Sequence, residues 1–306
     1  MEPYFESTLD FYRWQEYDLS KGGNSLVNKQ KQLPFLLQLL DDDVVTVRKN
    51  VMSELANIGS ELLTLIKPHL SSLNPRQHET LLRVFMLQRK AWLKENWSCW
   101  RKAKTEKAQI EKVSDLIVKF QFGVDYPFTV KNLLDGLADK YMDLHNEINP
   151  VSLANFLFKE ESFEGNKEDY FNPLNSNLVS VILSKSGIPI SLVIIYMLLG
   201  SRVGLNIEGY SIPHYFLART IHKGKGILVD CFDGGRVVEI ERLLTKGQNN
   251  QKHLQALNLV SNNRTIIKRI LQNLNHAYRK TGENDLSAFM IEILTIDSEQ
   301  KTTEEF

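Results

Sequence analysis

The chain has 306 residues, and its 37 basic and 37 acidic side chains give a formal net charge of zero at pH 7. This balance excludes a whole-protein field that would attract nucleic acid or an anionic membrane. The hydrophobic content of 42% is ample for a buried core, as in an ordinary globular protein.

The first segment in chain order, residues 1–15, is acidic and aromatic and does not have the basic start and apolar run of a secretory signal. The most apolar window, Ile188–Leu199, is shorter than the roughly 20 residues that a membrane helix needs. Cys99 and Cys231 lie far apart in sequence, which favours a reducing compartment over a disulfide scaffold. We therefore expect a cytoplasmic protein without a membrane segment.

Residues 1–120 have helical periodicity with almost no strand signal, and we expect an N-terminal helical region there. Its clearest part is a helical hairpin in residues 43–70, in which Asp43 is a candidate helix cap and Gly59 a candidate left-handed residue at the end of the first helix. This pattern is similar to a HEAT repeat, in which paired helices stack on their neighbours.

Residues 89–112 combine eight Lys or Arg side chains and three glutamates with Trp92, Trp97 and Trp100. A basic face with aromatic rings could bind phosphates and stack bases. The alternative, an amphipathic helix that buries its tryptophans and solvates its lysines, is the commoner situation. We therefore do not expect nucleic-acid binding.

Residues 121–245 are expected to form an α+β core. Gly187 is predicted to break one helix, Pro189 to begin an apolar central helix, and Gly204 to end it. Four β-rich runs follow with turns between them, and they predict an antiparallel meander packed on the central helix. The runs are Ile207–Ile212, Tyr215–Ile221, Ile227–Phe232 and Val237–Ile240.

Residues 246–306 are helical again. Leu274, Tyr278, Gly282, Ala288 and Leu294 have spacings similar to a tetratricopeptide repeat, which is a pair of antiparallel helices. We expect a C-terminal helical hairpin that buttresses the core.

Several phrases between Leu153 and Gly235 occur in an order that resembles the SirB family. They are FLFKEESFEGNKEDYFNPLNSNL, GIPISL at Gly187–Leu192, the run RVGLNIEGYSIP that ends at Pro213, and VDCFDGG at Val229–Gly235. The resemblance implies a core of the transglutaminase-like superfamily with a tetratricopeptide-like extension. It also implies the Cys-His-Asp triad of that superfamily, in which the cysteine begins the central helix.

The triad that this resemblance implies is degenerate here. Pro189 stands where the superfamily has its cysteine, and proline supplies neither a nucleophile nor a backbone N–H. Tyr215 falls at the histidine position, with His214 one residue early and so on the opposite face of a regular strand. Asp230 alone matches the triad.

Ser191 and Cys231 are the nearby side chains that could rebuild a site. A regular strand turns Cys231 away from Asp230, and helical geometry turns Ser191 away from the direction of residue 189. The spacing of the histidines suggests no metal site, and we expect no cofactor. The sequence favours a non-catalytic transglutaminase-like protein that binds a protein or peptide as a scaffold or regulator. The alternative is a cryptic cysteine or serine hydrolase, or an amide-transfer enzyme, with a rebuilt site.

Overall fold

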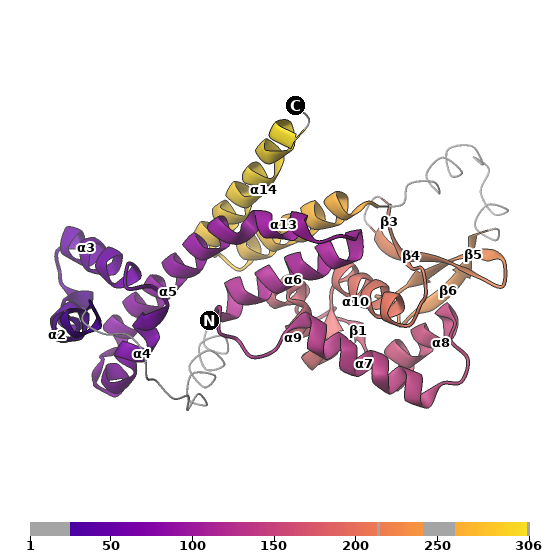
Figure 1. Cartoon of the computed structure of the whole chain (residues 1–306), viewed down its shortest axis with the longest axis horizontal. Helices are drawn as coiled ribbons and strands as arrows, with labels where there is room; N and C mark the ends of the chain where they lie inside the picture. Colours follow the sequence, from indigo (N-terminus) through magenta and orange to yellow (C-terminus); the bar gives the residue numbers. More distant parts are fainter. Residues whose placement is uncertain (1–24, 213–214, 241–260, 305–306) are drawn as a thin grey trace. The chain divides into compact units, whose positions relative to one another are not determined.

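A computed structural model of the protein describes residues 25–212, 215–240 and 261–304. Within these ranges the backbone is mainly helical and carries a small antiparallel sheet, which confirms the predicted α+β class (Figure 1). The chain divides into two compact units at residues 93 and 94. The predicted segments 1–120, 121–245 and 246–306 stay predictions.

The first unit is helical, and it contains the predicted hairpin. Gly59 has a φ of 77°, which confirms its left-handed conformation. The predicted cap at Asp43 is wrong, because Val44 precedes the helix and donates its N–H to the Asp42 carboxylate at 2.8 Å. The likeness to a HEAT repeat stays a prediction. The helices are α2 (Ser25–Gln38), α3 (Val45–Ala56), α4 (Leu62–Ile66) and most of α5 (Pro75–Asn96).

Two of the three tryptophans of the basic segment are core residues, whereas Trp92 is half-buried. Trp97 and Trp100 lie in a 3-10 turn, Trp97–Lys102, and both side chains are buried. The prediction of a single amphipathic helix through this segment is wrong, because α5 ends at Asn96 and α6 begins at Glu106. Residues three apart share one side of a 3-10 turn, so both rings point into the core.

The second unit is built around the predicted central helix, α10 (Pro189–Arg202), which is buried from Ile190 to Gly200. No helix within the described ranges is long and apolar enough to cross a membrane. The other helices of this core are α6 (Glu106–Phe122), α7 (Val130–Leu144), α8 (Pro150–Asn155) and α9 (Leu178–Ser184).

Four strands form the predicted meander, in the order β3-β4-β5-β6 with antiparallel neighbours. Along β4 the side chains alternate, with Phe216, Ala218 and Thr220 buried. The β4–β5 turn is tight because Lys223 and Gly224 both have positive φ. The strands are β3 (Glu208–Ile212), β4 (Tyr215–His222), β5 (Lys225–Asp230) and β6 (Arg236–Glu239).

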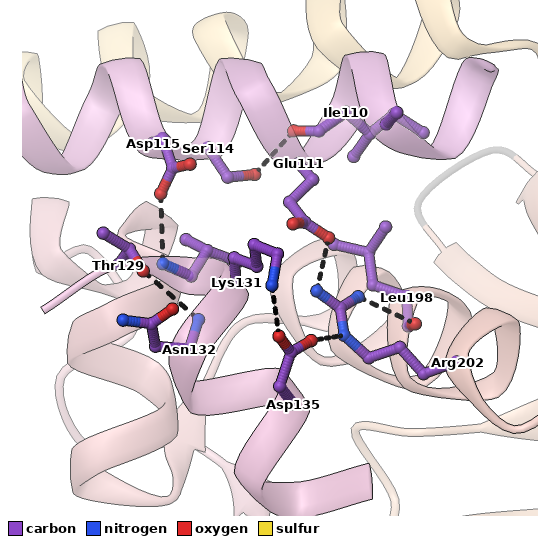
Figure 2. A network of polar contacts seen from close by, with 12 residues as sticks. Ile110, Glu111, Ser114, Asp115, Thr129, Lys131, Asn132, Asp135, Leu198 and Arg202 are labelled. Carbon is purple, nitrogen blue, oxygen red and sulfur yellow. Dashed lines mark hydrogen bonds and ion pairs between the residues drawn. The ribbon is translucent and has the colours of Figure 1, made fainter. Parts of the chain in front are cut away.

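A polar network holds the end of α10 against α6 and α7, as Figure 2 shows. The Arg202 guanidinium contacts Glu111 at 2.8 Å and Asp135 at 2.7 Å. On the same face of α6, Asp115 accepts the backbone N–H of Val130 at 3.0 Å, at the start of α7. Burial raises the pKa of the Asp115 carboxyl. The network fixes the C-terminal end of the central helix against α6 and α7.

The predicted C-terminal hairpin consists of α13 (Asn263–Lys280) and α14 (Asn284–Glu304). Gly282 has a φ of 83° and forms the sharp turn between the helices. One face of α13 is apolar and buried, with Ile267, Leu271 and Leu274 at its centre. The hairpin is therefore packed into the second unit (Figure 1).

Candidate functional site

The start of α10 is set by a short parallel pair of strands. β1 (Glu164–Gly165) pairs with β2 (Ser186–Gly187), and β2 leads directly into the helix. Pro189 is the first helical residue and is half-buried. Its fixed φ suits this position, and its missing N–H would have been unpaired there in any case.

Asp230 ends β5 and organises the turn that follows. Its carboxylate accepts the N–H of Asp233 at 3.1 Å, and an oxygen lies 3.5 Å from the Arg236 guanidinium. Its carbonyl accepts the N–H of Gly235 at 2.9 Å. The aspartate thus holds the β5–β6 turn in one conformation.

The turn and the start of α10 lie side by side. A Cβ added to Gly165 in β1 would stand 2.6 Å from ring carbons of Phe232 and 2.7 Å from its carbonyl oxygen. Only glycine allows the strand to approach the turn this closely. The structure thus places β1, and with it the β2 partner strand that leads into α10, against Phe232 in the turn after Asp230, and the convergence of Pro189 and Asp230 on one site stays a prediction.

Tyr215, at the superfamily's histidine position, is the first residue of β4 and is 60% exposed, whereas Phe216 is 2% exposed. The phenol therefore lies on the face of the strand opposite to the buried side chains. His214 lies outside the described residues, and its position relative to Asp230 stays a prediction.

The two side chains considered for a rebuilt site are both buried. The Ser191 hydroxyl donates to the Asn175 carbonyl at 2.5 Å. Burial raises the pKa of the Cys231 thiol well above its ordinary range, and the charge of Asp230 raises it further. A protonated, fully buried thiol is a poor nucleophile, and the Ser191 hydroxyl is already engaged.

A cavity of about 600 Å³ lies beside β1 and the β5–β6 turn. Its walls carry Lys159, Lys167, Phe163 and Asp233, together with Phe232 from the turn. Lys159 comes from a π-helical turn, Phe156–Glu160, a local geometry that is common at functional sites. The lining therefore combines charged groups of both signs with aromatic rings.

The sequence did not predict an asparagine network that lies within the segment FLFKEESFEGNKEDYFNPLNSNL. The Asn166 amide donates to the Asn175 side-chain oxygen at 3.0 Å, and the Asn175 amide donates to the Asp169 and Tyr170 carbonyls at 2.7 and 3.1 Å. Asn177 is completely buried and donates to the Gln121 side-chain oxygen at 3.0 Å. This network fixes the loop between β1 and α9.

Ion pairs of the Glu161 carboxylate hold the chain just before β1. Glu161 contacts Lys140 and lies 2.8 Å from the Lys185 ammonium, which also sits over the Phe163 ring. Desolvation opposes ionisation of the Glu161 carboxyl, but hydrogen bonds from Lys140 and Lys185 outweigh that effect and lower the pKa of Glu161. Among the residues that the structure describes, no group of three or more His, Cys, Asp or Glu side chains could hold a metal ion.

These features agree with the comparisons with known proteins. Residues 129–272 match the family model described as the transglutaminase-like superfamily. The match covers the central helix, the sheet and most of α13. This match supports the resemblance to the transglutaminase-like superfamily, while the SirB assignment and the degenerate triad stay predictions.

The chain is similar to a UPF0162 protein of Xylella fastidiosa strain Temecula1, with 34% identity over 184 residues, 54% of this chain and 64% of the relative. The chain thus spans less than two thirds of that relative's length. It is also similar to human F-box only protein 21, with 28% identity over 127 residues, 41% of this chain and 20% of the relative. No solved structure matches.

Proposed function

We propose that this chain is a non-catalytic transglutaminase-like protein of the SirB family. It acts in the cytoplasm and binds a protein or peptide partner as a scaffold or regulator. The observation that carries the proposal is the proline at the first position of the central helix, where the superfamily resemblance implies a nucleophile. The fold is kept while the group expected to do the chemistry is absent from that position.

The surroundings of Pro189 support the absence of chemistry. Ser191 is bonded to the Asn175 carbonyl, and Cys231 is a buried, protonated thiol. Asp230 is engaged with the turn through Asp233 and Arg236. Each candidate group therefore has a structural role that accounts for its presence.

Two observations support a protein or peptide as the partner. The polar cavity beside β1 is lined by cations, anions and aromatic rings, and such a lining can hold a polar chain such as a peptide. The name of the relative F-box only protein 21 places that protein among those that carry an F-box. The region that this chain shares with that protein is a candidate for binding a protein partner here.

The test is labelling of the native protein with a panel of thiol- and serine-directed probes, read by mass spectrometry. We expect no labelled serine or cysteine whose labelling depends on Asp230. Pro189→Cys is the positive control, because the N–H groups at a helix start lower the pKa of a thiol and make it reactive. Labelling of Ser191 or Cys231 that Asp230→Asn weakens would overturn the proposal in favour of a rebuilt enzyme.

A further inference from the structure

The exposed face of α13 is strongly basic. The helix carries five Lys or Arg side chains and one histidine, and it has no acidic residue. Lys268, Gln272, His276 and Lys280 follow one another at intervals of four and are all exposed. Residues at this spacing form a continuous row on one helix face. We call these four residues the basic ridge.

Two exposed aromatic side chains stand at one end of the basic ridge. Tyr170 and Phe171 are 42% and 39% exposed, and their rings meet edge to face at 5.3 Å. The Phe171 ring lies 5.2 Å from the His276 ring, and the Lys280 ammonium lies 5.5 Å from the centre of the Phe171 ring. The aromatic pair and the ridge thus form one continuous surface.

This surface is preorganised. The Tyr170 ring also meets the Phe232 ring at 6.0 Å, and the Tyr170 carbonyl accepts from the buried Asn175 amide. Rigid aromatic anchors cost little conformational entropy when a partner binds, which is why they dominate protein interfaces.

We propose that the basic ridge and the Tyr170–Phe171 pair bind an extended acidic peptide that carries an aromatic or apolar residue at one end. The proposal rests on the proposed function as a peptide-binding protein and names the chemistry of the partner. Lys268 and Lys280 span about 18 Å of helix, with one ridge residue every 6 Å or so. Alternate side chains of an extended peptide repeat at about 6.6 Å, so carboxylates spaced along such a peptide can reach Lys268 and Lys280, with Gln272 and His276 between them.

The geometry favours a peptide over nucleic acid. The His276 ring and the Lys280 ammonium already cover the Phe171 ring, which leaves less of it for a base to stack on. A carboxylate can contact the ridge cations while an apolar side chain packs on the exposed ring edges, and both contacts leave the existing cluster in place.

The experiment uses the full chain and a fluorescein-labelled peptide of about seven residues, with glutamate at alternate positions and phenylalanine at one end. Fluorescence anisotropy measures the dissociation constant. Lys268→Glu/Lys280→Glu should weaken binding at least about tenfold, because two attractions become repulsions. Phe171→Ala should weaken it at least about fivefold through loss of the anchor.

Lys102→Glu/Lys104→Glu is the matched control, since both lysines are exposed and the variant has the same net charge as the ridge variant. It should change the dissociation constant less than about twofold. A peptide with glutamine in place of glutamate should bind at least about tenfold more weakly. Circular dichroism melting curves verify that each variant is folded.

The proposal is overturned if the acidic peptide does not bind, if both double variants weaken it equally, or if the glutamine peptide binds as well. It is also overturned if a single-stranded oligonucleotide or an anionic vesicle binds the same ridge more tightly than the peptide. If the peptide-binding experiment fails, the labelling experiment still tests the non-catalytic function independently. Conversely, an Asp230-dependent nucleophile would remove the non-catalytic assignment while leaving the ridge as a peptide site.

Discussion

Replacing Asn177 by alanine should destabilise the second unit more than the loss of an ordinary helix cap does. The Asn177 side-chain oxygen accepts the N–H of Ser180 at 3.1 Å and so caps α9, while its amide donates to Gln121. Losing a cap costs about 1 kcal/mol. Removing a buried donor from its acceptor costs a further 1–3 kcal/mol or so. The expected loss of unfolding free energy is therefore about 2–4 kcal/mol.

Asn262→Ala provides a matched control. Asn262 caps α13 by accepting the N–H of Thr265 at 2.9 Å, and it is exposed. Its loss should cost about 1 kcal/mol. Urea unfolding followed by tryptophan fluorescence measures both variants, because the buried Trp97 and Trp100 report on the second unit. Equal losses in the two variants would refute the view that the buried amide of Asn177 stabilises the loop.

Three further outcomes are expected. The pKa of Glu161 is lowered in the folded protein, so the stability that its carboxylate contributes is present above the ordinary pKa and is lost as the pH falls below about 4.5. Glu161→Gln should therefore make the unfolding free energy fall less steeply with decreasing pH. Native protein should react with iodoacetamide at the half-exposed Cys99 but at Cys231 only after unfolding, and equal rates would contradict the burial argument. Gly165→Ala should lower the melting temperature by several degrees, because its methyl group would press on the Phe232 backbone; an unchanged melting temperature would show that the turn can move.

Much of the architecture could be predicted because local residues determine it. Pro189 begins the central helix, Gly204 ends it with a φ of 79°, and the strands lie within a few residues of the predicted runs. An all-round apolar helix and alternating β-rich runs are strong periodic signals. Such features need no knowledge of distant parts of the chain.

Features that depend on tertiary contacts were not predicted. The residue with positive φ after α9 is Lys185 rather than Gly187, and the contacts of Lys185 with Glu161 and Phe163 hold it there. Similarly, Asn177 looks like an ordinary turn residue in sequence, and its complete burial follows from a partner in α6. Local pattern does not reveal partners that lie more than 20 residues away.

The contacts of Gln121 have a consequence for how the protein is made. Its amide donates to the Pro173 carbonyl and to the Tyr278 hydroxyl, which lie 52 and 157 residues further along the chain. Contacts of such sequence separation form late and slow the folding of a domain. On the ribosome, Gln121 and the loop that carries Pro173 therefore emerge well before Tyr278, the other partner of Gln121. We therefore expect the core around α10 to reach its final packing only after the C-terminal hairpin has been synthesised, with the nascent chain open to chaperones and proteases until then.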